Sequence, residues 1–146
     1  MAKADIESAF RLLRVHPDSF PLLGFQLDGQ FYFDKCLHVG CAISCAYLKA
    51  FSSLLEWAVA AQLPKGGRLH YLDDMLFVGK AGSGHCKALL DTFMCLEEWL
   101  GVPLAPEKTE GPTTRSTFLG IDLDSVGGVC RLPMDKVLDL REGIKN

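Results

Sequence analysis

Two adjacent carboxylates interrupt an apolar segment in the middle of the chain. Residues 68 to 79 read RLHYLDDMLFVG, so that Asp73 and Asp74 separate two short runs of strand-forming residues. Burying one unpaired carboxylate is costly, and burying two side by side costs more. The pair therefore either occupies an exposed turn between two strands, where Asp is common, or belongs to a site that binds a positively charged group.

The composition is that of an ordinary globular domain. The chain has 146 residues, of which 49% are hydrophobic and 23% are charged, and this balance excludes a disordered chain. The net charge is only −3, whereas a domain that binds duplex nucleic acid by itself usually has a basic excess. Any nucleic-acid contact is therefore expected from local clusters or from other parts of a larger protein.

The cysteine pattern and the amino end favour an intracellular protein. The six cysteines form no C-x-x-C pair, and charged residues directly follow Met1, as they would not in a signal peptide. We expect reduced thiols and a location in the cytoplasm or the nucleus. The most apolar stretch, residues 37 to 63, contains Lys49 and Glu56, which argues against a membrane-spanning helix.

Four thiol and imidazole groups lie close together in the segment CLHVGCAISC. Cys36, His38, Cys41 and Cys45 have the spacing C-x-H-x₂-C-x₃-C, which matches none of the common zinc patterns. Cys41 and Cys45 are also four residues apart at the start of an apolar helical stretch. We interpret the cysteines as small buried side chains, with a zinc site as the alternative.

Hydrophobic periodicity and turn residues predict a mixed order of strands and helices. The dipeptide Asp28-Gly29 between two apolar runs is a strong signal for a hairpin with a two-residue loop. The long helical pattern over 42–62 ends before Pro64. The expected elements are a strand ending at Asp5, a hairpin over 24–33, a helix over 42–62, strands over 68–72 and 75–79, a helix from an N-cap at Ser83 to Gly101, a strand over 116–123 with Thr117, Leu119, Ile121 and Leu123 on one side, a turn at Gly127-Gly128, and a helix over 134–144.

Without its inserts this order is β-α-β-β-α-β, which is typical of an α+β, ferredoxin-like fold. We expect the first strand to be central and to lie beside the 68–72 strand, so that Asp5 meets Asp73 and Asp74. Three carboxylates within ~4 Å of each other repel by a few kcal/mol per pair at an effective dielectric constant of about 20. Mg²⁺ prefers oxygen ligands, and two such ions hold the attacking and leaving oxygens of phosphoryl transfer. This pattern predicts a nucleotidyl-transfer centre with two Mg²⁺ ions, for which Mn²⁺ would substitute.

Five segments, in order, resemble the motifs of a reverse transcriptase palm. DIESAF resembles the first motif, in which an aromatic follows an aspartate by five positions, and YLDD resembles the tyrosine-x-Asp-Asp box. The other three segments are CLHVGCAISCAYLKAFSSLLEW for the glycine-then-helix motif, LGVPLAPEKTEGP for the lysine-bearing loop and TFLGIDL for the primer-grip hairpin. The amino-acid sequences of these segments most resemble those of DIRS- or Ngaro-like retrotransposons. The resemblance implies a palm over 1–132 with partial fingers at approximately 11–40, and the start of a truncated thumb helix over 133–146.

The resemblance also implies a role for each matching residue. Asp5 and Asp73 would hold the metal ions, Asp74 would support them, and the carbonyl of Ile6 would be a further ligand. Lys108 would act as a general acid on the leaving pyrophosphate. In the substrate site, Phe10 would stack under the incoming sugar and Gly40 would let the backbone approach the new base pair. The remaining implied residues are Tyr71 for substrate binding and Phe118, Leu119 and Gly120 for the primer grip.

The implied partners are an RNA or DNA template with its primer, deoxynucleoside triphosphates, and the rest of a larger polyprotein with fingers, thumb and nuclease. We expect no membrane contact. Since the chain begins at the first motif, it is expected to be a fragment whose activity alone is doubtful.

Two other interpretations remain open. His38 and Val39 stand where the family usually has proline and a bulky residue before the glycine, and Arg14 stands where proline is expected. These departures fit an inactive, transposon-derived relic. The second alternative is a non-enzymatic, ferredoxin-like RNA-binding module, but the aromatic run K/R-G-F/Y-G/A-F-V-x-F/Y of such modules does not occur.

Overall fold

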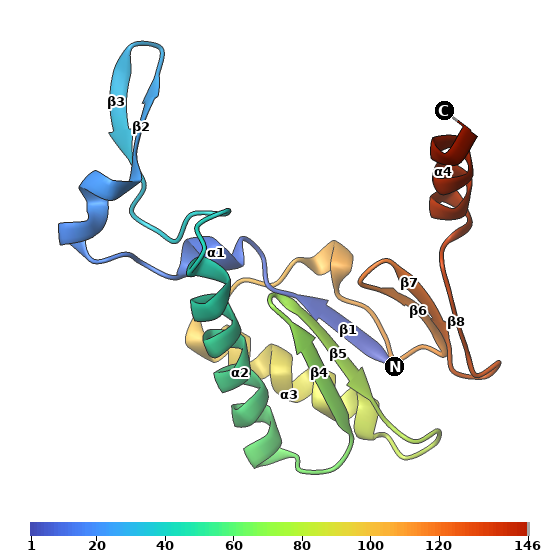
Figure 1. Cartoon of the computed structure of the whole chain (residues 1–146). Coiled ribbons are helices and arrows are strands. Elements are labelled where there is room, and N and C mark those ends of the chain that lie inside the picture. Colours follow the sequence, from blue (N-terminus) through green and yellow to red (C-terminus); the bar gives the residue numbers. More distant parts are fainter. Residues whose placement is uncertain (146) are drawn as a thin grey trace.

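The computed structural model describes residues 1–145, which form a central sheet with two long helices, a projecting hairpin and a C-terminal set of strands and a helix (Figure 1). The predicted α+β class is confirmed. The elements in chain order are β1 (Ala2–Asp5), α1 (Ala9–Leu12), the 3₁₀ helix η1 (Pro17–Leu23), β2 (Gly24–Leu27), β3 (Gln30–Phe33), α2 (Ser44–Gln62), β4 (Gly67–Tyr71), β5 (Asp74–Val78), α3 (His85–Leu100), the 3₁₀ helix η2 (Pro106–Lys108), β6 (Arg115–Phe118), β7 (Ile121–Asp124), β8 (Val129–Arg131) and α4 (Met134–Lys145).

The central sheet has the order β1-β5-β4, with both pairs antiparallel. The expectation that the first strand lies beside the 68–72 strand is therefore wrong, because β5 separates β1 from β4. The chain crosses over through α2, so that β1 and β4 are parallel but not adjacent. Strand β5 returns from β4 through a tight turn and lies between them. On the other side of β1, where a ferredoxin-like fold has its fourth strand, Lys3 forms a single bridge with Glu110, and Ile6, just after β1, forms one with Leu104.

The hydrophobic core lies between this sheet and helices α2 and α3, which contact each other and the sheet. The buried residues of α2 recur at helical spacing, as an amphipathic helix requires. In the centre the rings of Phe77 on β5 and Phe93 on α3 lie 5.4 Å apart. No described helix combines the length and the hydrophobicity that crossing a bilayer requires.

The ends of α3 follow the predicted signals with one shift. Gly101 ends the helix in the left-handed conformation, as expected for a C-terminal glycine. At the other end the N-cap residue is Gly84 rather than Ser83. Ser83 still has the predicted hydrogen-bonding role, because its Oγ accepts from the backbone N–H of His85 at 3.3 Å.

The β2–β3 hairpin projects away from the rest of the molecule (Figure 1). Asp28 and Gly29 form its two-residue loop, and both have positive φ angles, of 50° and 75°, as the sequence signal predicted. All residues of both strands are exposed. An ion pair between Arg11 and Asp34 ties the base of the hairpin to α1 and lowers the pKa of Asp34, chiefly through the hydrogen bond from Arg11.

The segment TFLGIDL forms a tight hairpin between β6 and β7 rather than one strand. Leu119 and Gly120 form its loop, with φ angles of 49° and 71°. The predicted set of Thr117, Leu119, Ile121 and Leu123 is not one buried face of a single strand, because the turn divides it between two strands, and the buried residues of β6 are Ser116 and Phe118. A leucine gives no sequence signal for a left-handed conformation, so the alternation pattern did not predict this turn, whereas the family resemblance did imply a hairpin in this segment.

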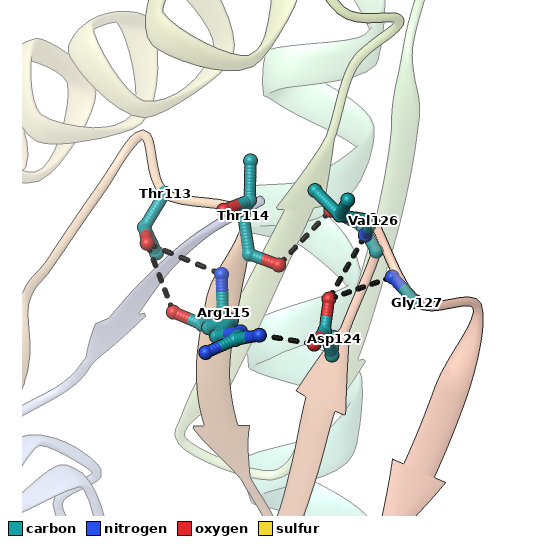
Figure 2. Close-up of polar contacts among 7 residues, drawn as sticks. Thr113, Thr114, Arg115, Asp124, Val126 and Gly127 are labelled. Atoms are coloured by element: carbon teal, nitrogen blue, oxygen red, sulfur yellow. Dashed lines mark hydrogen bonds and ion pairs between the residues drawn. The ribbon is translucent and has the colours of Figure 1, made fainter.

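Strands β6, β7 and β8 form a second three-stranded sheet. Polar contacts around Asp124 stabilise the end of this sheet that is opposite the β6–β7 loop (Figure 2). One carboxylate oxygen of Asp124 accepts hydrogen bonds from the backbone N–H groups of Val126 and Gly127, at 3.0 and 2.9 Å. The other oxygen accepts from Nε of Arg115 at 2.9 Å. The hydrogen bond from Gly127, and then the charge of Arg115, lower the pKa of Asp124, so these contacts fix the turn that leads into β8.

Candidate active site

The tandem acids lie at the tip of the β4–β5 hairpin. Tyr71 and Asp74 are cross-strand partners, so Leu72 and Asp73 form a two-residue loop. Leu72 has a φ angle of +53°, a conformation that costs a bulky L-residue about 1–2 kcal/mol. Its side chain packs against the hydrophobic core, which holds the strained tip in one position.

Strand β1 brings Asp5 to this tip. Asp5 is the direct cross-strand partner of Asp74, and the backbone N–H of Ile6 donates to the carbonyl oxygen of Asp73 at 3.1 Å. The carbonyl of Asp5 in turn accepts from the N–H of Ala105 at 2.9 Å. The structure thus brings together the three acids that the sequence analysis selected, although the strand pairing that does so differs from the one expected.

Lys108 joins the acids from the end of η2. Its Nζ lies 3.2 Å from Oδ1 and 3.1 Å from Oδ2 of Asp5. The Lys108 side chain is 58% exposed, whereas that of Asp5 is 9% exposed. The hydrogen bond to Asp5 and the Asp5 charge, with smaller contributions from the other two acids, raise the pKa of Lys108, so its ammonium form is stabilised.

Burial and like charge raise the pKa of Asp74. The largest cause is loss of hydration, followed by the charges of Asp73 and Asp5, while the charge of Lys108 opposes the shift. Hard carboxylate oxygens that repel each other in this way suit Mg²⁺ by their chemistry. As they stand, however, no three His, Cys, Asp or Glu side chains within residues 1–145 are arranged as a metal-binding group. The donor atoms fit the ion, and their role as ligands stays a prediction.

The three residues predicted for substrate binding have different surroundings. Tyr71 is exposed and lies opposite Asp74. Phe10, on α1, is half-buried and packs against the core. Gly40 lies in the loop before α2 with a φ angle of +92°, and a Cβ atom there would meet no other atom within 4 Å. The backbone conformation alone therefore requires glycine at this position.

The predicted primer-grip residues form the tip of the β6–β7 hairpin, where Phe118 is buried and Leu119 is exposed. The hairpin is tied to the central sheet because Nζ of Lys3 on β1 donates to the carbonyl of Thr117 at 2.9 Å. Next to the tip, Nζ of Lys136 on α4 lies 3.4 Å from the carbonyl oxygen of Gly120.

A polar cluster between α2 and β4, centred on the buried His70, was missed by the sequence analysis. Nδ1 of His70 lies 2.6 Å from a carboxylate oxygen of Glu56, and Nε2 lies 2.7 Å from Nζ of Lys49. Since an ammonium only donates, this arrangement assigns the Nδ1–H tautomer to the imidazole. The available signal was that Lys49 and Glu56 are two helical turns apart. The cluster fixes β4 to α2 just before Tyr71.

The interpretation of the cysteines as buried side chains is wrong for two of them. Cys41 and Cys45 are exposed, and Cys36 is half-buried. The reason is that α2 begins at Ser44 and turns Ser44 and Leu48 toward the core, so that the neighbouring thiols face outward. The alternative zinc group is likewise not formed in the described part of the chain.

An antiparallel sheet with tandem acids at one hairpin tip and a third acid on the adjoining strand has the architecture of a polymerase palm. The chain matches the family described as reverse transcriptase (RNA-dependent DNA polymerase) over residues 1–123. It belongs to that family.

Individual relatives agree with this assignment. The chain is 29% identical over 150 residues to the genome polyprotein of Petunia vein clearing virus, in both the Shepherd and the Hohn isolates, and the match covers 99% of this chain and 6% of the polyprotein. Two structures of the foamy viral protease-reverse transcriptase share its fold. The complex with an RNA/DNA hybrid gives a TM-score of 0.73 at 22% identity, covering 92% of this chain and 17% of the other. The complex with double-stranded DNA gives 0.74 at 23% identity, covering 92% and 26%.

The chain therefore spans only a small part of the proteins that it resembles. The expected context of a larger polyprotein agrees with this, whereas the boundaries of the palm and thumb segments and the DIRS- or Ngaro-like subgroup stay predictions.

Proposed function

We propose that this domain is the catalytic palm of a retroelement polymerase, which adds deoxynucleotides to a primer under the direction of an RNA or DNA template. The observation that carries the proposal is the direct cross-strand pairing of Asp5 with Asp74, beside Asp73 at the strained hairpin tip. A fold gains no stability from opposed carboxylates, so their convergence is best explained by catalysis.

In this proposal Asp5 and Asp73 hold two Mg²⁺ ions, with Asp74 and the carbonyl of Ile6 in support. When bound, the ions activate the primer 3′-hydroxyl and stabilise the charge that develops on the transferred phosphoryl group. The buried position of Asp5 and the backbone hydrogen bonds around it keep the carboxylates fixed before substrate arrives.

Lys108 is proposed as the proton donor to the leaving pyrophosphate. Its position beside Asp5 supports this role, because it places a protonated side chain next to the three acids. Phe10, Gly40 and Tyr71 are proposed to contact the incoming nucleotide, and the tip of the β6–β7 hairpin is proposed to support the primer terminus.

Template and primer are the proposed macromolecular partners. The structural neighbours were solved as complexes with an RNA/DNA hybrid and with double-stranded DNA, and this supports nucleic-acid binding here. With a net charge of −3, this domain supplies little electrostatic attraction to phosphates. Fingers, thumb and nuclease of a larger polyprotein are proposed to provide the missing basic surfaces.

The test is single-nucleotide addition to a labelled primer on RNA and DNA templates, with Mg²⁺ or Mn²⁺. We expect Asp73→Asn to lower the rate by roughly 10²- to 10³-fold, the scale on which one preorganised electrostatic group contributes. Asp91→Asn is the matched control, because Asp91 is an exposed acid of α3 that pairs with Lys87, and it should leave the rate unchanged.

Two results would count against catalysis by this chain. Absence of metal-dependent addition by the unaltered chain would favour an inactive relic or an incomplete enzyme. RNA binding that needs no divalent ion and survives Asp73→Asn, again without addition, would favour an RNA-binding module.

A further inference from the structure

The contact between Lys108 and Asp5 joins residues 103 positions apart in the chain. Both carboxylate oxygens of Asp5 accept from the one ammonium group, at 3.2 and 3.1 Å. The pair is asymmetric, because the acceptor is 9% exposed and fixed on a strand, whereas the donor is 58% exposed on a long side chain. The ammonium therefore approaches a buried anion from the solvent side.

Lys108 is also the cation whose charge acts on the neighbouring acid Asp74. One ammonium thus faces three adjacent carboxylates and supplies a single positive charge. Both carboxylate oxygens of Asp5 are directed to Nζ of Lys108.

We propose that Lys108 is a built-in counter-ion, whose ammonium occupies the cation position at Asp5 until a divalent ion binds there and releases it. This inference rests on the proposed function and adds an order of events to it. While Lys108 donates to both oxygens of Asp5, it is not free to donate to a pyrophosphate. Metal binding would therefore make the proton donor available only when the site is complete.

The exchange is physically reasonable on both sides. The lysine side of the pair is open to solvent, which weakens the pair, whereas a divalent ion brings twice the charge to a distance of about 2.1 Å from the oxygen. No covalent bond changes, and the ammonium keeps its protons. The largely exposed stem of Lys108 gives it room to move toward bound phosphates.

The first test measures the affinity for Mn²⁺ by electron paramagnetic resonance with the unaltered chain and with Lys108→Met. If Lys108 is a counter-ion, Lys108→Met should bind Mn²⁺ about fivefold more tightly than the unaltered chain. This factor is the upper range for the contribution of one ion pair that is open to solvent. Lys65→Met, which removes an exposed charge from the loop after α2, should change the affinity by less than about twofold. Lys108→Arg keeps the charge and should retain an affinity close to that of the unaltered chain.

The second test observes the Lys108 ammonium directly by NMR, with the signal assigned by its absence in Lys108→Met. We expect the signal to shift or broaden as Mg²⁺ is added, with the same midpoint as metal binding. Asp73→Asn should move this midpoint to higher Mg²⁺ concentration.

The outcomes separate the two proposals. Equal Mn²⁺ affinities of the unaltered chain and Lys108→Met, or a Lys108 signal that does not respond at saturating Mg²⁺, would overturn the counter-ion and leave the metal site intact. No Mn²⁺ binding by any of the folded variants would overturn the proposed function and the counter-ion with it.

Discussion

The β2–β3 and β4–β5 hairpins both have two-residue loops, but they obtain their stability in opposite ways. The β2–β3 hairpin has the favourable loop Asp28-Gly29, yet both of its strands are exposed. The β4–β5 hairpin has a strained leucine in its loop, yet Met75, Leu76 and Phe77 of β5 are buried. The comparison teaches that a favourable loop does not by itself place a hairpin in the core, and that packing permits strain at the candidate site.

The largest expected effect is a core truncation in β5. Phe77→Ala should lower the free energy of unfolding by about 3–5 kcal/mol, because it removes a fully buried ring that contacts Phe93. The matched change in the projecting hairpin is Phe31→Ala, at a side chain that is 84% exposed, and it should change the free energy by less than about 0.5 kcal/mol. Urea denaturation measures both, and similar losses would break the comparison.

The next effect concerns Glu97, a buried acid on the core face of α3. It is 1% exposed, and neither carboxylate oxygen has a hydrogen-bond partner in the described part of the chain. Burial raises its pKa from 4.5 to about 7. Because the folded-state pKa is the higher one, the stability that this group contributes below pH 4.5 is lost as the pH rises toward and through about 7.

Glu97→Met should therefore stabilise the chain at pH 8 by up to about 3 kcal/mol and by much less at pH 4.5. Glu98→Met, at the exposed neighbouring position, is the control and should show no such pH dependence. Denaturation curves between pH 4.5 and 8 measure the difference. A parallel pH profile for Glu97→Met and the unaltered chain would contradict the assignment.

Two glycines with positive φ angles sharpen the comparison of the hairpins. Gly29→Ala places a Cβ in open space, so it should cost only backbone strain of about 1 kcal/mol. At Gly66, just before β4, a Cβ would lie 2.6 Å from Cδ1 of Leu89 and 3.2 Å from the carbonyl oxygen of Val78. Gly66→Ala should therefore cost about 1–2 kcal/mol more. Equal thermal shifts for the two variants would show that the core yields at this point.

The smallest effect is expected at the acid pair itself. Burial and the neighbouring acids raise the pKa of Asp74. Asp74→Asn removes this carboxylate, so it should increase the free energy of unfolding at pH values above the folded-state pKa of Asp74. Relief of opposed like charges on adjacent strands contributes about 0.2–1 kcal/mol. Thermal unfolding at pH 7 measures the gain, and a loss of stability would show that Asp74 has a structural partner.

Local signals were sufficient for much of this fold. Apolar residues at helical spacing from Ile43 to Ala61 predicted α2, Asp28-Gly29 predicted its hairpin, and Gly101 marked the end of α3, because each depends on neighbours in sequence. The buried face of α2, with Leu48, Leu55 and Val59, is however not the face that this spacing selected. The order of β1, β4 and β5 was not predictable in this way, since it depends on how a crossover and a hairpin pack together.

In the candidate site, too, the residues could be predicted from local sequence but the contacts between them could not. The motifs selected Asp5, Asp73, Asp74 and Lys108, but only the folded chain shows that Lys108 donates to Asp5. The cluster around His70 carried no sequence signal beyond two charges on an apolar helix. Contacts between distant segments were therefore the part that sequence reasoning could not supply.

The register that sets Asp5 against Asp74 has a consequence for anyone who engineers this domain. A selection for heat resistance alone would reward a neutral replacement at Asp74, because burial and the neighbouring acids disfavour its charge, whereas Asp5 has Lys108 as its counter-ion. Directed evolution should therefore combine each round of thermal selection with an activity assay, because the most thermostable variants are otherwise expected to be inactive.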